Sequence, residues 1–93
     1  MDEGTITIPT TDIGNILGAP YNVVLFNDED HSMDEVCSQI VKATHCDPGK
    51  AFMVMLEAHK SGRAIVYSGH RERCEHVESV LVEIKLGTKI EQA

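Results

Sequence analysis

YNVVLFNDEDHSMDEV, residues 21–36, joins a strand pattern to a helix start, with five polar residues between the two. Tyr21–Phe26 carries β-branched residues between aromatic ends, which predicts a buried strand. Ser32 is followed three positions later by Glu35, the pattern of a capping box, so a helix is expected to begin at Ser32. Residues 27–31 therefore lie outside both elements, at the carboxyl end of the strand.

Caps and apolar spacing predict the remaining elements. The first helix should end near His45 or Cys46, and Asp47-Pro48 should start a second helix that Gly62 ends. A strand is expected at 63–67, a third helix after it up to Gly87, and a last strand at 88–91. The expected apolar faces of the three helices are Met33, Val36, Ile40, Val41 and Thr44; Phe52, Met55, Leu56 and His59; and Cys74, Val77, Val80, Leu81 and Ile84.

The order β-α-α-β-α-β predicts an α+β fold. We expect a small two-layer α/β sandwich, in which a three-stranded antiparallel sheet packs against three helices. Residues 1–20 have no sustained period, which predicts a flexible N-terminal extension before a core domain at 21–93.

Length, composition and charge limit the class of protein. Ninety-three residues with 42% apolar and 25% charged residues are typical of one globular domain. No apolar run approaches the roughly 20 residues that span a bilayer, so no membrane segment is expected. The net charge of −7 argues against a nucleic-acid surface. Three cysteines without CxxC spacing indicate reduced thiols in a cytosol.

The polar residues 27–31 concentrate hydrogen-bond acceptors next to a predicted helix face that carries His59. If this face borders the loop, Met33 and Met55 would line the floor of a shared cleft. Carboxylate, amide and imidazole acceptors suit an ammonium group, and methionines suit apolar side chains of varied shape. An ammonium beside a bulky apolar side chain describes the first residue of a polypeptide. A hydrogen-bonded core histidine and a solvated acidic turn are the alternative interpretations.

Two segments, YNVVLFNDEDHSMDEV at 21–36 and AFMVMLEAHKSGRAIV at 51–66, together with the ending IEQA, resemble the Clp protease adaptor family, ClpS. The family motifs have the forms Y-x-V-x-L-x-N-D-D-x-T-P-M-x-x-V and M-L-x-V-H-x-x-G-x-A. The similarity runs without a gap over about residues 20–67 and continues less closely to the end.

The resemblance implies an adaptor without catalytic residues, metal or cofactor. Such an adaptor binds N-degrons, whose first residue is Leu, Phe, Tyr or Trp, and hands their bearers to a Clp AAA+ ATPase–protease. The resemblance assigns the α-amino group to Asn27, Asp28, Glu29 and His59, and the first side chain to Leu25, His31, Met33, Val36, Met55, Ala58 and Leu86. Glu72 and residues 1–20 would contact the N-terminal domain of the ATPase. A monomer in the bacterial cytoplasm, or in a plastid stroma, is expected.

The chain departs from the family pattern at several of these positions. Glu29 stands where the family has a second Asp, and His31 stands where it has the Thr of Thr-Pro. Ala58 replaces a Val, which enlarges the expected pocket. The family's docking lysine aligns with Val77, and the short third helix leaves Leu86 as the counterpart of a C-terminal pocket leucine. These differences predict a divergent branch with altered specificity or an altered partner ATPase.

Two other function classes stay open on the sequence alone. His70, Cys74 and His76, with His45-Cys46, are possible ligands of a small metal-binding or hydrolytic domain, although residue 76 points away from 70 and 74 on a helix. A degenerate ClpS-like domain, which binds and modulates the ATPase without recognising N-degrons, is the second alternative.

Overall fold

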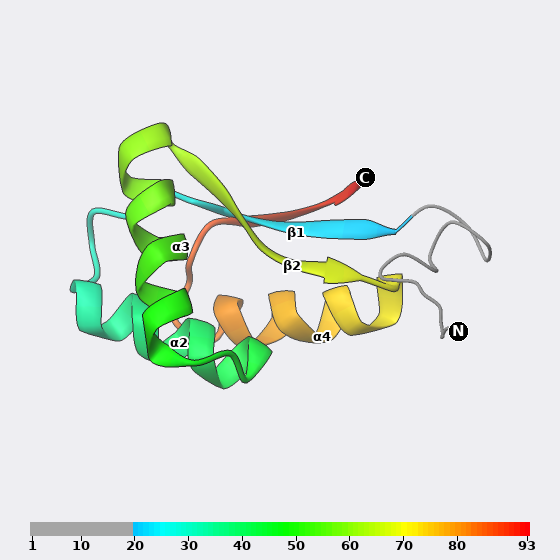
Figure 1. The fold of residues 1–93 in the computed structure, drawn as a ribbon, viewed down its shortest axis with the longest axis horizontal. Helices are drawn as coiled ribbons and strands as arrows, with labels where there is room; N and C mark the ends of the chain where they lie inside the picture. The colour runs from blue at the N-terminus through cyan, green and yellow to red at the C-terminus, as the bar shows by residue number, and fades with distance from the viewer. Residues whose placement is uncertain (1–19) are drawn as a thin grey trace.

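The computed structural model describes residues 20–93, and their secondary structure follows the predicted order β-α-α-β-α-β (Figure 1). The elements are β1 (Tyr21–Phe26), α2 (Met33–Thr44), α3 (Pro48–Ser61), β2 (Arg63–Gly69), α4 (Arg71–Val82) and β3 (Thr88–Gln92). The prediction of an α+β fold with a three-stranded antiparallel sheet and three helices is confirmed. The predicted N-terminal extension, residues 1–20, lies outside the described residues except for Pro20.

β1 is the central strand of the sheet, with β2 and β3 antiparallel on its two sides. Its middle residues Val23, Val24 and Leu25 are at most 1% exposed, which explains the unbroken apolar run in the sequence. Figure 1 shows α4 along one face of the sheet and α3 beside the end at which β1 leads into the loop before α2. The carboxyl end of β1 therefore lies close to both α2 and α3.

Side-chain caps confirm both predicted helix starts. Ser32 Oγ accepts from the amide of Glu35 at 3.1 Å, and the Glu35 carboxylate accepts from the amide of Ser32 at 2.9 Å, which completes the capping box. The Asp47 carboxylate accepts from the amide of Lys50 at 3.0 Å at the start of α3. These caps satisfy amides that have no partner inside their helices. The predicted stop of α3 is also confirmed, because Gly62 caps it in the left-handed region with φ of 90°.

The buried face of α3 differs from the predicted one. Ala51, Met55 and Ala58 are buried, whereas Phe52 is 44% exposed and His59 is exposed as well. The helix packs against both α2 and β2, and its alanines allow a close approach to these two elements. The predicted apolar face is therefore wrong for Phe52 and His59, because the buried side of the helix is formed by Met55 with the two alanines.

The buried face of α2 agrees with the prediction at Val36 and Ile40 and differs at Met33. Met33, the first residue of the helix, is 54% exposed. Gln39 and Ala43 complete the buried face.

Gln39 is a buried polar residue that links α2 to the end of α4. Its Nε2 donates to the carbonyl oxygen of Val80 at 2.6 Å and to Glu83 Oε1 at 3.2 Å. Lys42 Nζ lies 2.9 Å from the same Glu83 oxygen. The two α2 side chains thus add contacts to the C-terminus of α4, where the Val80 carbonyl also accepts from the Glu83 amide at 3.1 Å.

α4 ends at Val82, well before the predicted stop at Gly87. The chain then turns, with Lys85 in the left-handed region at φ of 65°, and Leu86, 3% exposed, enters the core. The Phe26 amide donates to the Gly87 carbonyl at 3.0 Å, which leads this segment into β3. The predicted boundary is wrong because apolar residues of the turn continue the helical spacing after the helix has ended.

β3 brings the end of the chain back to the start of the sheet. Gln92 pairs with Tyr21, and the Ala93 amide donates to the Pro20 carbonyl at 2.8 Å. No helix within residues 20–93 is both long and apolar enough to cross a membrane.

The three cysteines, Cys37, Cys46 and Cys74, are free thiols. Burial raises the pKa of the Cys37 and Cys74 thiols, which favours their uncharged, unreactive form.

Candidate functional site

A cavity of about 230 Å³ lies where β1 ends, bordered by the loop at 27–31, the first turn of α2 and one side of α3. Its lining residues are Leu25, Phe26, Asn27, Asp28, Glu29, His31, Met33, Val36, Met55, Ala58 and His59. The structure thus brings all the candidate N-degron-binding residues except Leu86 around one cavity.

The inner wall of the cavity is apolar and buried. Leu25 and Ala58 are 1% and 2% exposed, and Val36 and Met55 are each 6% exposed. Met33 lies at the open side and is the most exposed apolar member of the lining. Because a methionine side chain has three rotatable bonds, Met33 can adjust the width of the opening to different ligands.

Phe26 is a lining residue that the sequence analysis missed. Alternation along a strand places the side chains of Leu25 and Phe26 on opposite faces, so the strand pattern by itself does not indicate a pocket shared by both. Phe26 is the last residue of the strand, however, and its backbone is already held by Gly87 rather than by a strand partner alone. A half-buried aromatic residue at a strand–loop junction is the signal that would have indicated its position.

The loop after β1 is anchored to the end of α3. The Asn27 amide donates to the Gly62 carbonyl at 3.0 Å, which fixes where the loop begins. Asn27 Nδ2 donates to Glu29 Oε2 at 3.0 Å. Since its amide nitrogen is used in this way, Asn27 presents its side-chain oxygen as the acceptor.

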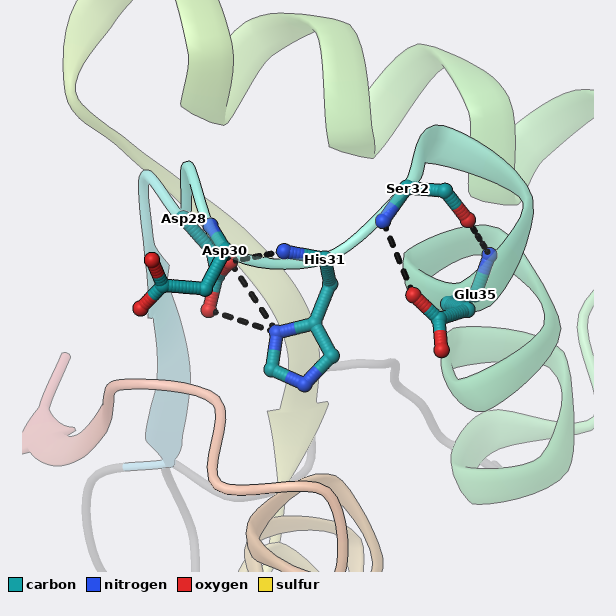
Figure 2. Close-up of polar contacts among 5 residues, drawn as sticks. All are labelled: Asp28, Asp30, His31, Ser32 and Glu35. Carbon is teal, nitrogen blue, oxygen red and sulfur yellow. Dashed lines mark hydrogen bonds and ion pairs between the residues drawn. The ribbon is translucent and has the colours of Figure 1, made fainter.

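Asp28 holds the next part of the loop and contacts His31 (Figure 2). Asp28 Oδ1 accepts from the amides of Asp30 and His31 at 2.7 and 2.8 Å. His31 Nδ1 lies 3.0 Å from both carboxylate oxygens of Asp28. The side chains are only 12% exposed for Asp28 and 20% exposed for His31, so water weakens their contact little.

The contact between Asp28 and His31 changes the pKa of both groups. Burial raises the pKa of the Asp28 carboxyl, but hydrogen bonds from the His31 side chain and from the His31 and Asp30 amides outweigh it, and the net pKa is lowered. The hydrogen bond to Asp28 raises the pKa of His31, and burial opposes this only in part. The negative charges of Asp28, Glu35 and Asp30 raise it further.

His59 reaches the cavity from α3. Together with Met55 and Ala58 it follows the i, i+3, i+4 spacing of one helix side, and all three residues line the cavity. The His59 side chain is exposed, which argues against the alternative of a hydrogen-bonded core histidine. Its imidazole lies at the open side of the cavity, where a ligand can reach it.

Three other positions named from the sequence lie away from the cavity lining. Leu86 is buried in the core at 3% exposure and is not among the lining residues. Glu72 is exposed in the first turn of α4. Val77, which aligns with the family's docking lysine, is completely buried, so this position cannot present a side chain to a partner.

The possible metal ligands do not come together. Cys74 is fully buried and lies 3.5 Å from the Tyr21 carbonyl, whereas His70 and His76 are exposed. Within residues 20–93, no group of three His, Cys, Asp or Glu side chains is placed to hold a metal ion. The metal-binding alternative therefore has no supporting site in the described part of the chain.

The chemistry of the cavity is that of two adjoining sites. Asn27, Asp28, Glu29 and His59 supply acceptors at one end, which suit a group with several donors and a positive charge. The apolar wall lies beside them. A dry cavity of about 150 Å³ is large enough for benzene, so the volume here can contain an aromatic or branched aliphatic side chain.

Comparisons with known proteins identify the family and the fold of this chain. The model of a family described as ATP-dependent Clp protease adaptor protein ClpS matches residues 18–85. The ATP-dependent Clp protease adapter protein ClpS of Acetivibrio thermocellus is 29% identical over 87 residues, which cover 89% of this chain and 88% of that protein. In the solved structures, Agrobacterium tumefaciens ClpS2 bound to L-phenylalaninamide superposes with a TM-score of 0.75 at 21% identity, covering 81% of this chain and 98% of the other, which shows a shared fold.

Two much larger proteins contain a similar segment. The E3 ubiquitin-protein ligase UBR1 of Drosophila melanogaster is 32% identical over 65 residues, or 70% of this chain. Human UBR2, also an E3 ubiquitin-protein ligase, is 34% identical over 62 residues, or 67% of this chain. The chain spans only 4% of the length of either ligase.

Proposed function

The chain belongs to the ClpS family of Clp protease adaptors, and from this premise we propose that it binds N-degrons in the cavity at the end of β1. The ligand is the first residue of a polypeptide, with a free α-amino group and a bulky apolar side chain. The observation that supports this most directly is the position of the acceptors beside an apolar cavity of about 230 Å³. The protein acts by binding and carries out no reaction of its own.

The acceptor end of the cavity suits the α-amino group. An ammonium carries three donors, and Asn27, Asp28 and His59 come from two sides of the cavity to accept them. Glu29 contributes by holding the Asn27 side-chain amide, so that the oxygen of this amide faces the ligand. Glu29, which is longer than the Asp of the family, thus orients the Asn27 side chain.

The apolar wall suits the first side chain. Leu25, Val36, Met55 and Ala58 are buried and leave space for a Leu or Phe side chain. The relative of the same fold bound to L-phenylalaninamide supports this proposal, because that ligand combines a free α-amino group with an aromatic side chain. Which first residue is preferred follows from the exact width of the opening.

Delivery to a Clp AAA+ ATPase is the second part of the proposal. In this scheme residues 1–20 and Glu72, which is exposed on α4, contact the N-terminal domain of the ATPase. The bound N-degron protein is then passed on for degradation. The adaptor would act as a monomer in the bacterial cytoplasm or in a plastid stroma.

A fluorescence-anisotropy titration tests the binding proposal. Peptides that begin with Phe or Leu are expected to bind, and N-acetylated versions of the same peptides are expected to lose at least about 10-fold in affinity, or about 1.4 kcal/mol. The reason is that acetylation removes the positive charge and the donors that would pair with the acceptors, of which Asp28 is only 12% exposed. Equal binding of free and acetylated peptides would contradict the proposal.

A pair of variants tests the site itself. Asp28→Asn keeps the shape of the side chain and an oxygen that accepts the loop amides, but it removes the charge, and a loss of about 10-fold or more is expected. Asp34→Asn is the matched control, because Asp34 is an exposed acid of α2 outside the cavity lining. If the ATPase binds while no peptide does, the chain is instead a degenerate domain that modulates the ATPase.

A further inference from the structure

The Asp28 carboxylate is a preorganised acceptor in the cavity wall. Two backbone amides, of Asp30 and His31, hold Oδ1 at 2.7 and 2.8 Å. His31 Nδ1 spans both carboxylate oxygens at 3.0 Å, so the plane of the carboxylate is fixed as well. With the Asp28 side chain only 12% exposed, solvent contributes little to its orientation. A ligand amine therefore meets an oxygen that is already in place, which lowers the entropic cost of binding.

His31 is itself held rigidly. It comes directly before Ser32, whose capping box with Glu35 fixes the backbone at the start of α2 (Figure 2). The imidazole lines the same cavity as Asp28 and is 20% exposed. Because a carboxylate can only accept, Nδ1 of the neutral imidazole carries the proton, and its N–H donates a hydrogen bond to Asp28.

We propose that His31 is a positioning residue that presents the Asp28 carboxylate to the substrate's α-amino group and weakens binding when it becomes protonated. This inference rests on the proposed function, because it concerns the same amine site. Neutral His31 orients Asp28 and does not neutralise the Asp28 carboxylate, whose full negative charge can then attract the ammonium of the ligand. Protonated His31 forms an ion pair with Asp28 and adds a positive charge where the ammonium must bind.

The surrounding charges determine the direction of the pH effect. Asp28, Asp30 and Glu35 favour the protonated imidazole in the free protein, and they raise the pKa of His31. Glu29 from the loop and His59 from α3 line the same cavity. An arriving ammonium opposes protonation of His31, so affinity is expected to rise as the pH increases through the His31 pKa. The α-amino group of the ligand loses its own charge near pH ~8, which sets an upper limit.

Three variants, compared with the wild type, separate the positioning of Asp28 by His31 from the effect of the charge on His31. His31→Asn keeps a donor close to the position of Nδ1 but does not titrate, and His31→Ala removes the donor. His76→Asn is the matched control, since His76 is an exposed histidine of α4 outside the cavity. Each form is titrated with a peptide that begins with Phe, at about pH 5.5, 6.5 and 7.5 and constant ionic strength.

The wild type and His76→Asn are expected to lose about three- to tenfold in affinity between pH 7.5 and 5.5, the effect of one nearby charge. At about pH 7.5, where neutral His31 orients Asp28, His31→Ala should bind more weakly than the wild type. His31→Asn should recover most of that loss and should show a smaller change with pH. Two results would overturn the inference. One is the same pH dependence in His31→Asn as in the wild type, and the other is wild-type affinity in His31→Ala at about pH 7.5.

A titration without any ligand gives a second, independent test. The imidazole resonances of His31 should show a pKa above the ordinary 6.5 in the wild type and a lower value in Asp28→Asn. An unchanged His31 pKa in Asp28→Asn would show that the two groups are not coupled, and the inference would fail. Failure of the proposed function looks different, because the wild type would then bind no free N-terminus at any pH.

Discussion

Met33 and Gly62 are the two positions at which a single residue has the clearest local role. Met33 stands at the open side of the cavity and is 54% exposed, while the wall behind it is buried. Gly62 ends α3 at φ of 90° and also accepts the Asn27 amide that anchors the loop. Both positions are therefore suited to a test by single substitution.

Met33→Ala is expected to broaden specificity. In the wild type, Met33 should crowd the branch at the β-carbon of Ile and Val, so peptides that begin with these residues should bind less well than those with Leu or Phe. Removing the side chain should improve binding of Ile and Val peptides by at least about threefold, or ~0.7 kcal/mol. Anisotropy titrations measure this change.

The control for this change is Met53→Ala, because Met53 is a 64% exposed methionine of α3 that does not line the cavity. It should leave the preference unaltered. If Met33→Ala gave no gain for Ile or Val peptides, Met33 would not limit entry to the cavity.

Gly62→Ala is expected to destabilise the fold by about 1 kcal/mol, because a Cβ is disfavoured at its positive φ although no atom lies within 4 Å of it. In a domain of this size the melting temperature should fall by roughly 4–8 °C. Gly87→Ala is the matched control, since its added Cβ would make ordinary contacts at 3.7 Å with Phe26. Similar losses in both variants would mean that backbone conformation is not the cause.

At the level of the elements, α2 connects the cavity to the rest of the molecule. Its first turn forms one edge of the cavity, and its middle is bonded to the end of α4 through Gln39 and Lys42. Gln39 is buried and donates to two acceptors, whereas Lys42 and Glu83 form an exposed ion pair. Burial determines which of these contacts contributes more to stability.

Gln39→Leu is expected to lower the free energy of unfolding by about 1–1.5 kcal/mol, because the Val80 carbonyl loses its nearer donor, at 2.6 Å, and keeps only the Glu83 amide at 3.1 Å. Lys42→Met, at an exposed pair, should cost less than about 1 kcal/mol. Urea denaturation of both variants measures the difference. A larger loss for Lys42→Met than for Gln39→Leu would contradict this ranking.

Helix starts were predictable from the sequence, and helix faces and ends were less so. Ser32 and Asp47 act through local hydrogen bonds to residues three positions ahead, which a sequence pattern contains in full. The buried face of α3 depends on how closely α2 and β2 approach, and this distance is set by tertiary packing. The stop of α4 at Val82 depends in turn on the reversal around Lys85, where neither Gly nor Pro marks the turn.

For the molecule as a whole, the charged groups limit the pH range of stability. The pKa of Asp28 is lowered, because its hydrogen bonds outweigh the effect of burial. Hydrogen bonds from Lys42 and Gln39 lower the pKa of Glu83, and a hydrogen bond from Arg63 lowers the pKa of Glu91. A lowered folded-state pKa stabilises the protein above the ordinary value, here 3.8 to 4.5, and this contribution is lost as the pH falls through the lowered value. His31 has the opposite sign, since its raised pKa stabilises the fold below 6.5 and the contribution is lost at higher pH.

The melting temperature is therefore expected to be highest between about pH 4.5 and 6.5, and to fall on the acid side. Thermal denaturation followed by circular dichroism from about pH 3 to 8, at fixed ionic strength, measures this profile. In His31→Asn the decline on the alkaline side should become smaller. Equal melting temperatures at about pH 3 and 5.5 would contradict the assignment of the acidic groups.

The candidate site was more predictable than the packing around it. Its polar residues come from one short loop and one helix, and two separate motifs contain nearly all of them. Phe26 was not named from the sequence, because it stands at an unspecified position of the first family motif, between Leu25 and Asn27. Leu86 was placed in the pocket by resemblance alone, and the structure buries it in the core instead. The contact between His31 and Asp28 depends on the loop conformation, which no sequence pattern specified.

The backbone hydrogen bond from Ala93 to Pro20, at 2.8 Å, has a consequence for how this fold can be used within larger proteins. It places the entry and exit points of the described core side by side. A unit with adjacent ends can be inserted into a surface loop of a host protein without forcing the two sides of that loop apart. The same property permits circular permutation, in which the old ends are joined by a short linker and new ends are opened elsewhere. The cavity at the opposite end of β1 would remain accessible in either arrangement.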